Sequence, residues 1–494
     1  MKTNTLDFDA QALREKILDL AMRGKLVPQD PNDEPASVLL EKIKAEKEQL
    51  IKDKKIKKSK PLAPITDDER PFDIPDSWEW VRLGDVNTYN SESVHPDRTP
   101  DKTFELYSVP IFPTRKPEII KGEEIRSNKQ AVETGDVLLC KINPRINRVW
   151  KVSNFTDNEN IASTEWIVVR QREITTEYLR YSLMAPYFRN LLQSNVSGVG
   201  GSLTRAKPRE VRNYVLPIPP LSEQSRIAAK IAQLFALLRK VESSTQQYAK
   251  LQTLLKSKVL DLAMRGKLVE QDPHDEPARV LLEKIKAEKE QLFKEGKIKK
   301  SKPLPLITDD EKLFDIPDSW EWVRLGELTQ KVGAGNTPKG GSKSDVYVSE
   351  GVKFIREMNV YNDGLHMKGM AFIRPELAQK RTGSAVYAKD ILLNITGGSL
   401  GRTTLINDDF DLGNVNQHVL VIRNVDSKIR KYMHLFLCSP LAQNIIHNKS
   451  VGDKAGFSAT KTKNLVLPLP PLGEQIKIVR MIKKLFLMIK LEKQ

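Results

Sequence analysis

The chain has 494 residues, 80 Lys and Arg against 64 Asp and Glu, and a formal net charge of +16. Its hydrophobic content of 39% and charged content of 29% exclude a wholly disordered chain. The presence of only Cys140 and Cys438 excludes a disulfide scaffold and favours a reducing compartment. Without a signal peptide or a long apolar run, we expect a cytoplasmic protein with no membrane association. The basic excess favours a polyanionic partner.

Two stretches of the chain occur twice. The repeated pairs are 17–86 with 259–328, called segment A, and 213–242 with 464–493, called segment B. Segment A repeats with an offset of 242 and about 57 of 70 identical positions, and segment B repeats with an offset of 251. Residue 494 aligns with 494 − 251 = 243, and residue 1 aligns with 1 + 242 = 243. The end of the chain and its start thus align with the same residue, so the repeat continues from the C-terminus to the N-terminus and is circular. A circular repeat predicts two halves related by a pseudo-two-fold axis.

Segment B followed by segment A predicts a long helix. It starts at Ser222 after a proline-rich stop, carries an apolar stripe with steps of three and four, and extends to about Leu268, with Gly266 as a stop. A second amphipathic helix, near 280–292, should run back along it. The C-terminal stretch 476–489 should pair with the N-terminal helix. We expect two antiparallel helices that separate two globular domains.

Lysine runs follow the second helix of each half, near Lys52 to Lys60 and Lys294 to Lys302. They fit either a solvated linker, which we favour, or a phosphate-binding surface. The motif DSWEWVRLG then opens each globular segment. Its alternation of apolar and polar residues predicts a first strand with a tryptophan that is buried in the core and does not stack on a nucleic-acid base.

The two halves differ in the variable segments between A and B, residues 87–212 and 329–463. These segments predict two α/β domains, because each has strand-like apolar runs and a helix-like stretch. Residues 81–213 carry 20 − 16 = +4 charges, and residues 323–464 carry 20 − 12 = +8. Most of the basic excess therefore lies in these domains, which favours binding there. The expected domains are 1–76 (helices and basic linker), 77–215 (first recognition domain), 216–318 (central helices and linker), 319–466 (second recognition domain) and 467–494 (C-terminal helix packing with the N-terminal helix).

Motifs for bond chemistry are missing. Asn143-Pro144-Arg145-Ile146 lacks the Asn-Pro-Pro-Tyr pattern of an amino-methyltransferase, and the glycine-rich string at 335–341 lacks the Lys-Ser/Thr of a phosphate loop. No HExxH motif is present. The only Glu-x-Lys, Glu295 to Lys297, lies in a lysine linker. We expect a chain without catalytic residues, cofactor or metal of its own.

Clusters of Lys, Arg, Asn, Gln, Ser and Thr follow the predicted strands of both variable domains. These side chains suit guanine and adenine edges and phosphates, although an ordinary polar loop is the plainer interpretation of any one of them. The candidate DNA-binding residues are Lys141, Asn143, Arg145, Asn147, Arg148, Ser202, Thr204, Arg205 and Lys207 in the first domain, and Asn394, Thr396, Gly398, Ser399, Arg402, Asn416, Gln417, His418, Lys454, Ser458, Thr460 and Lys461 in the second.

Several strings resemble the specificity subunit of type I restriction-modification systems: the duplicated LDLAMRGKL and LLEKIKAEKEQL, the LPxPPLxEQ of each segment B, and GDILLNITGGSLGR with NVNQHV. The first domain has GDVLLCKINPRINRVW instead, without the Gly-Gly-Ser-Leu-Gly element. The resemblance implies two target-recognition domains that read a bipartite double-stranded DNA target, and conserved helices that dock two adenine-N6 methyltransferase subunits. It further implies two restriction and translocation subunits, with S-adenosylmethionine, ATP and Mg²⁺ bound by the partners.

Unlike inserts on a pseudo-symmetric frame imply two unlike half-sites, about one DNA turn or roughly 34 Å apart. Two other functions stay open from the residues alone. A stand-alone DNA-binding regulator would use the same basic domains without partners. A restriction enzyme with its own active site would cleave or methylate DNA as an isolated chain.

Overall fold

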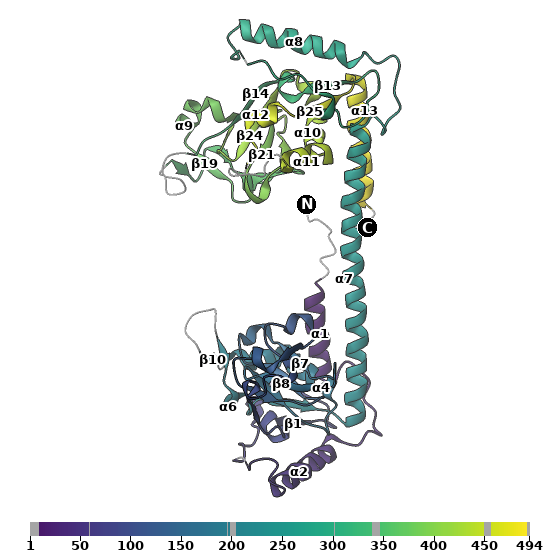
Figure 1. Cartoon of the computed structure of the whole chain (residues 1–494), viewed down its shortest axis with the longest axis vertical. Coiled ribbons are helices and arrows are strands. Elements are labelled where there is room, and N and C mark those ends of the chain that lie inside the picture. Colours follow the sequence, from purple (N-terminus) through teal and green to yellow (C-terminus); the bar gives the residue numbers. More distant parts are fainter. Residues whose placement is uncertain are drawn as a thin grey trace. The chain divides into compact units, whose positions relative to one another are not determined.

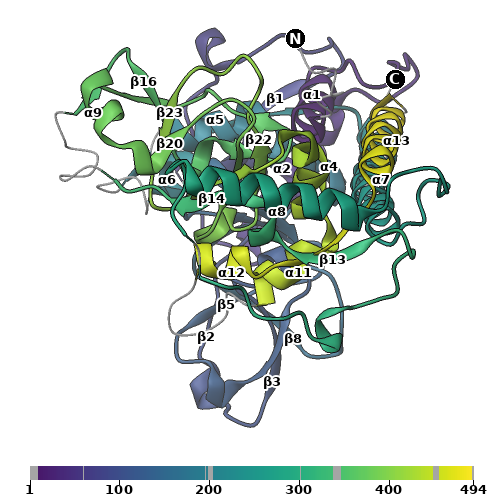
Figure 2. The same cartoon turned by 90° about the horizontal axis from the view of Figure 1, so that it is seen from above.

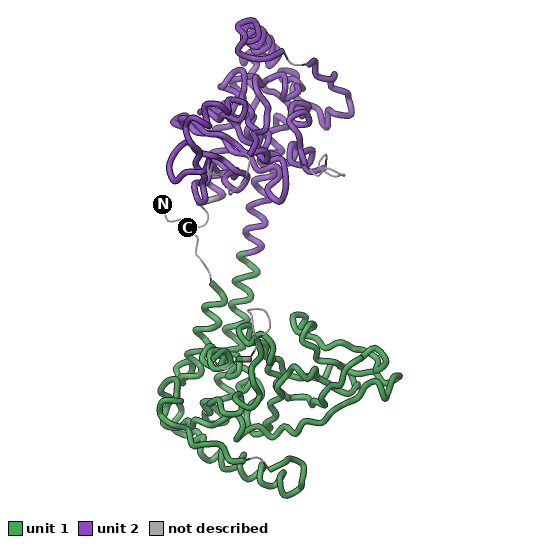
Figure 3. Tube along the Cα trace, turned by 90° about the vertical axis from the view of Figure 1, so that its left-hand side faces the viewer, with its two compact units in different colours: residues 1–245 green, residues 246–494 purple. Residues whose placement is uncertain are grey.

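A computed structural model describes residues 9–58, 60–194, 196–197, 204–300, 302–337, 346–448 and 456–491. The chain forms two compact units, residues 1–245 and 246–494, coloured separately in Figure 3. Each unit contains one segment A, one variable segment and one segment B. The duplication in the sequence is therefore a duplication of the folded unit.

The predicted long helix is present as α7, Leu221–Met264. In the first unit α1 (Ala10–Met22) lies beside α7, and Arg14 forms an ion pair with Glu242. In the second unit α13 (Leu472–Leu491) lies beside the later part of α7, where the Gln252 side chain donates to the carbonyl of Ile489 at 2.7 Å (Figure 1). Each unit thus has an antiparallel helix pair; the contact expected between the C-terminal and N-terminal helices stays a prediction.

The second amphipathic helix of each half is α2 (Ala36–Lys52) or α8 (Ala278–Lys294). The expectation that it runs back along the long helix is wrong for the second unit, where α8 lies crosswise to α7 (Figures 1 and 2). The N–H of Ala278 donates to the carbonyl of Ser319 at 2.9 Å, and Lys289 donates to that of Gly326 at 2.6 Å. These bonds hold the helix on the globular part of its own unit.

Both variable segments fold as mixed sheets with helices, and two-stranded antiparallel ribbons link their starts to their ends. In the first unit these elements are the ribbon β1 (Glu79–Arg82) with β12 (Val215–Ile218), the sheet β7-β6-β9 (Val149–Lys151, Val137–Cys140, Trp166–Val169), the sheet β2-β5-β8-β3-β4 (Ser93–Val94, Lys129–Ala131, Glu159–Ser163, Thr103–Tyr107, Glu118–Lys121), α4 (Thr176–Met184), α5 (Pro186–Ser194) and α6 (Pro208–Val211).

The second unit repeats this plan. Its elements are the ribbon β13 (Glu321–Arg324) with β25 (Val466–Leu469), the sheet β14-β24-β21-β22 (Thr329–Ala334, Val419–Asn424, Ile391–Asn394, Thr403–Leu405), the sheet β15-β19-β16-β23-β20 (Tyr347–Val348, Ala371–Ile373, Val352–Ile355, Gly413–Val415, Ala385–Val386), the hairpin β17-β18 (Val360–Tyr361, Gly364–Leu365), α10 (Arg430–Cys438), α11 (Pro440–Asn448) and α12 (Ala459–Lys463). The predicted α/β class with long helices is confirmed.

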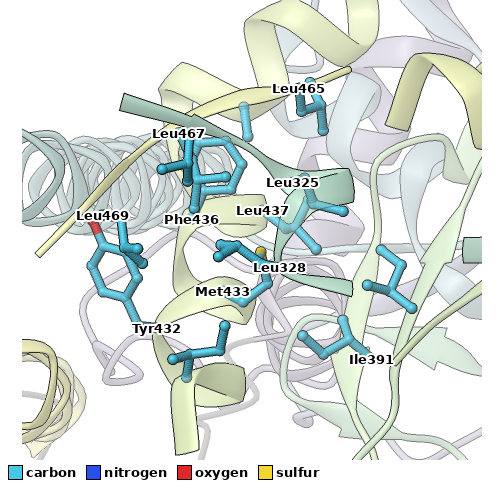
Figure 4. Close-up of a cluster of buried hydrophobic side chains, with 14 of the residues drawn as sticks. Leu325, Leu328, Ile391, Tyr432, Met433, Phe436, Leu437, Leu465, Leu467 and Leu469 are labelled. Atoms are coloured by element: carbon cyan, nitrogen blue, oxygen red, sulfur yellow. The ribbon is translucent and has the colours of Figure 1, made fainter. Parts of the chain in front are cut away.

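In the second unit, a continuous apolar core packs against the sheet β14-β24-β21-β22. Tyr432, Phe436 and Leu437 of α10 pack against Leu467 and Leu469 of β25 (Figure 4). The Tyr432 hydroxyl donates to the carbonyl of Pro468 at 2.7 Å, which satisfies the one polar group of that buried ring. The same bond joins Tyr178 to the carbonyl of Pro217 in the first unit, at 2.6 Å. The core therefore fixes the ends of each variable segment in the same way.

One tryptophan of each segment A confirms the predicted buried aromatic. Trp78 and Trp320 are each 3% exposed, and their indole N–H groups donate to Glu223 at 2.9 Å and Glu474 at 2.8 Å. Burial raises the pKa of both carboxyls. These bonds join segment A to segment B inside each unit.

The segment after each lysine run is fixed by a buried arginine, whereas the lysines themselves are exposed. Arg82, 4% exposed, donates to the carbonyls of Ala63, Pro64 and Asn213 and forms a bidentate ion pair with Glu69 at 3.0 and 2.6 Å. This hydrogen bonding lowers the pKa of Glu69 to about 2. The expected solvated linker is therefore confined to the lysine run, because the chain is fastened again within a few residues.

Arg324 repeats this arrangement in the second unit. It is 2% exposed, forms a bidentate ion pair with Glu311 at 3.1 and 2.7 Å, and donates to the carbonyl of Asn464 at 2.8 Å. The pKa of Glu311 is likewise lowered to about 2 by its hydrogen bonds with Arg324. We call each arginine with its partners the arginine clamp.

Candidate nucleic-acid interface

The strongest predicted cluster of each domain lies on a loop that follows the central strand, β6 or β21. We call residues 141–148 and 395–402 the recognition loops. In the first, the N–H of Cys140 donates to the carbonyl of Arg148 at 3.0 Å; in the second, the N–H of Asn394 donates to that of Arg402 at 2.8 Å. Each loop contains one short 3-10 turn, Pro144–Ile146 or Gly397–Ser399. The two loops therefore have the same frame.

Left-handed residues at matching positions shape both loops. Gly397 has φ +67° and Gly401 has φ +83°, while Asn143 and Asn147 have φ 48° and 47°. Asparagine adopts this conformation more readily than other residues with a side chain. The first domain thus lacks the glycine element in its sequence but keeps the same backbone conformation. Asn143 and Asn147 are the residues from which this conformation could have been predicted.

The second predicted cluster of the first domain joins this loop, which residue types alone did not predict. The N–H of Asn143 donates to the carbonyl of Thr204 at 2.8 Å, and the N–H of Ala206 donates to that of Lys141 at 2.9 Å. A depression of about 440 Å³ lies between the two segments, and its lining includes Lys141, Arg205, Lys207 and Arg209. Ser202 lies outside the described residues. Two basic segments far apart in sequence therefore form one surface.

The predicted residues of the first domain divide into two groups. Asn147 donates to the carbonyl of Leu183 at 3.0 Å, and Arg148 donates to that of Ile142 at 3.2 Å, so these side chains support the loop. Arg205 forms an ion pair with Glu165 at 3.2 Å. The side chains of Arg145 and Lys207 are exposed and have no hydrogen bond or ion pair with any residue that the structure describes. Arg145 and Lys207 therefore have donors available to a ligand, whereas Asn147, Arg148 and Arg205 are bonded within the domain.

In the second domain the residues after β21 and those between β23 and β24 form one polar network. His418 Nδ1 lies 2.7 Å from the Thr396 hydroxyl, and its backbone N–H donates to the Asn416 side chain at 3.1 Å. The Gln417 amide reaches both Thr337 and the His418 ring. The NVNQHV string therefore supports the recognition loop from one side.

Glu357 is a residue that sequence reasoning missed. Its carboxylate accepts from the Asn416 amide at 2.7 Å, and its backbone carbonyl accepts from the Asn394 amide at 2.8 Å. Burial opposes ionisation of Glu357, but the hydrogen bond from Asn416 and the nearby His418 and Arg356 outweigh it and lower its pKa. Asn394 and Asn416 are 0% and 5% exposed, so both support the site from below.

The remaining predicted residues of the second domain lie at the rim of the loop. Gly398 is exposed, and a Cβ built there meets no atom within 4 Å. The N–H of Phe457 donates to the carbonyl of Ile395 at 2.8 Å, which brings the segment with Ser458, Thr460 and Lys461 to the loop. Ser458 caps α12 by accepting from the N–H of Lys461 at 3.2 Å. Ser399 is half-buried in the loop, and Lys454 lies outside the described residues.

Two other kinds of site are missing from the parts of the chain that the structure describes. No group of three or more His, Cys, Asp or Glu side chains could hold a metal ion there. None of the helices within those ranges is long and apolar enough to cross a bilayer. The polar and basic loop surfaces are therefore the candidate sites of the two units.

Two repeated α/β units, each with a polar loop surface, define a class of binding protein with two sites. The family model described as "Type I restriction modification DNA specificity domain" matches residues 75–252 and again 317–494. The chain therefore belongs to the family of type I restriction-modification specificity subunits, and sequence-specific DNA recognition is the role that this family implies.

Curated relatives and a solved structure agree with this assignment. The specificity subunit of the type I restriction enzyme EcoEI from Escherichia coli is 31% identical over 97% of this chain and 89% of its own length. That of EcoAI, also from Escherichia coli, is 33% identical over 96% of this chain and 88% of its own length. A solved chain from work on complex assembly and conformational transition of the type I R-M system has a TM-score of 0.60, covers 86% of this chain and 93% of its own, and is 22% identical, which shows the fold.

Proposed function

We propose that each unit reads one part of an asymmetric bipartite DNA target and that the chain thereby directs adenine-N6 methylation and restriction by partner subunits. One observation carries the proposal: the two recognition loops share a backbone but present different side chains. Pro144 of the first loop corresponds to the exposed Gly398 of the second. The exposed Arg145 of the first loop corresponds to the half-buried Ser399 of the second. Equal frames with unequal side chains suit two unequal half-sites.

The proposed partners are two methyltransferase subunits and, through them, two restriction and translocation subunits, which would bind S-adenosylmethionine, ATP and Mg²⁺. The exposed faces of α2 and α8 support a partner bound twice, since they carry the same residues. The identical exposed pairs are Glu41 and Glu283, Lys42 and Lys284, Lys44 and Lys286, Ala45 and Ala287, Glu48 and Glu290, and Gln49 and Gln291.

The exposed faces of the long helices differ between the copies. Lys230 of α7 corresponds to Met481 of α13, and Gln233 corresponds to Lys484. A partner that binds both units alike therefore finds the same surface on α2 and α8.

We expect Lys42→Glu with Lys44→Glu to reduce the number of methyltransferase copies that co-purify from two to one, and the added changes Lys284→Glu and Lys286→Glu to remove the second. Lys230→Glu with Gln233→Glu is the control, and an unchanged stoichiometry in the four-site variant would refute this docking surface.

Methylation mapping tests the recognition role. The full chain is co-expressed with its methyltransferase partner in a host without other adenine methylation, and N6-methyladenine is mapped across the genome. We expect one asymmetric motif with two short defined parts around a fixed gap. Arg145→Ala should relax only one part, whereas Lys57→Ala on the exposed lysine run should leave the motif intact. Methylation that persists without this chain would contradict the proposal and favour a stand-alone DNA-binding function.

A further inference from the structure

The same loop position carries an arginine in both units, but the two guanidinium groups are used differently. Arg148 turns into its own loop, where it donates to the carbonyl of Ile142 at 3.2 Å and lies 3.8 Å from the Cys140 sulfur. Arg402 places its guanidinium 4.6 Å from the centre of the Tyr361 ring. Within the ranges that the structure describes, the Arg402 guanidinium has no hydrogen bond or ion pair. Its donors therefore have no acceptor in this part of the protein.

The ring under Arg402 is itself fixed. Tyr361 ends β17, and the His366 ring stacks on it at 4.0 Å with an interplanar angle of 14°. His366 is oriented by Asp363, whose carboxylate lies 3.0 Å from its Nε2. The Asn362 side chain accepts from the N–H of Thr403, the residue after Arg402, at 2.9 Å. The hairpin β17-β18 is thus attached to the chain beside Arg402 and holds an ordered stack.

A stacked, unpaired arginine is suited to reading a base. Its planar fork of N–H donors matches the O6 and N7 acceptors of guanine in the major groove. Stacking on Tyr361 removes much of the side-chain freedom that binding would otherwise have to remove. The guanidinium is only half-buried, and none of its nitrogens is among the buried side-chain atoms without a partner, so its donors remain open to a ligand. The position of Arg402, at the end of the recognition loop, places these donors within the proposed interface.

We propose that Arg402 reads a guanine in the half-site of the second unit and that Tyr361 and His366 are its positioning residues. The hairpin β17-β18 thereby becomes part of the DNA interface, although no pattern in the sequence marks it as such. The inference rests on the proposed function, and it names one base and the residues that select it. At the matching loop position of the first unit, Arg148 is occupied within its own loop.

Modified DNA tests this inference directly. The full chain with its methyltransferase partner is titrated with duplexes that carry its mapped target, and each guanine of the second half-site is replaced in turn by 7-deazaguanine, which lacks N7. We expect one replacement to weaken wild-type binding about tenfold or more. Arg402→Ala should bind the natural duplex about as weakly as the wild type binds that modified one, and should lose the sensitivity to it.

Variants of the ring separate positioning from direct contact. Tyr361→Phe should keep the sensitivity to 7-deazaguanine, because stacking needs the ring and not the hydroxyl. Tyr361→Leu should lose most of it while the chain stays folded by circular dichroism. Arg148→Ala is the matched control and should leave discrimination in this half-site unchanged.

Three outcomes overturn the inference. In the first, no 7-deazaguanine replacement weakens binding by the wild type. In the second, Arg402→Ala is as sensitive to the replacement as the wild type. In the third, Arg402→Ala weakens binding to every sequence by the same factor, as the loss of a phosphate contact would predict. Each leaves the proposed function intact, because the wild type still selects its target. A wild-type complex that selects no sequence would refute the proposed function as well.

Discussion

The two units have the same internal frame and different candidate recognition surfaces. In both, a buried arginine clamps the linker, a buried tryptophan bonds a carboxylate near the start of α7 or α13, and a tyrosine hydroxyl bonds a carbonyl of the closing strand. The surface that differs begins where each central strand ends. Each unit therefore repeats a few polar contacts at the edge of an apolar core, and the exposed side chains of the loops are where the units differ.

This repetition extends into the variable segments. Asp136 is 0% exposed and forms a bidentate pair with Arg170 at 2.8 and 2.7 Å; Asp390 is 1% exposed and forms the same pair with Arg423 at 2.7 and 2.6 Å. Both aspartates precede the strand that leads to the recognition loop. The start of each central strand is thus fixed by an ion pair, whereas side chains at the exposed positions of the loop that follows differ between the units.

The largest expected effect comes from breaking the arginine clamp in one unit. Arg82→Met and Arg324→Met should each reduce the free energy of unfolding of their own unit by about 3 kcal/mol, since each leaves buried carbonyls and a carboxylate without donors. Denaturant unfolding of the full chain, followed by hydrogen exchange in each unit, measures this loss. The exposed Arg70→Met, which removes only a surface pair with Asp67, should cost less than about 0.5 kcal/mol. Unequal losses at the two clamps would show that the frames are not equivalent.

A smaller effect is expected from exchanging residues at the left-handed loop positions. Gly397→Ala should cost about 1 kcal/mol, because φ is +67° and nothing lies within 4 Å of the added Cβ to cause a clash. Gly397→Asn should cost less, and Asn143→Gly should be close to neutral if the backbone is what the two loops share. Thermal unfolding and the mapped methylation motif report stability and recognition separately. Equal costs for Ala and Asn at position 397 would refute the equivalence of the loops.

Local patterns predicted much of this fold. The apolar stripe of α7 and the alternation around Trp78 and Trp320 identified a helix and two strands because periodicity is a property of neighbouring residues. The direction of α8 was not predictable, since it depends on bonds from Ala278 and Lys289 to a distant part of the chain. Tertiary contacts decide such directions.

The candidate site was predictable in part for the same reason. Residue types near strand ends identified both recognition loops, but not which side chains would turn inward, as Asn147 and Arg148 do. Glu357 and Tyr361 lie more than 30 residues before the loop they support, and no local motif marks either one. Their roles appear only when the sheet brings these segments together.

The smallest expected effect is a pH dependence that both units share. The pKa values of Glu69 and Glu311 are lowered from 4.5 to about 2, mainly by hydrogen bonds from the clamp arginines. Because the unfolded chain then binds protons more readily than the folded one, these carboxylates stabilise each unit above pH 4.5, and that contribution is lost as the pH falls toward about 2. Their side chains are 38% and 27% exposed, so solvent screening keeps the contribution small.

Clamp variants assign this acid dependence to its unit. Unfolding of the full chain is compared at pH 6 and at roughly pH 3, within the window between the unfolded and folded pKa values. Arg82→Met should be less stable at pH 6 but lose less stability on acidification in the first unit, while the second unit behaves as in the wild type. Glu223 and Glu474 act in the opposite direction, because burial raises their pKa and their contribution declines as the pH rises through the raised values. An acid dependence that Arg82→Met leaves unchanged would mean that other carboxylates, and not the clamps, determine it.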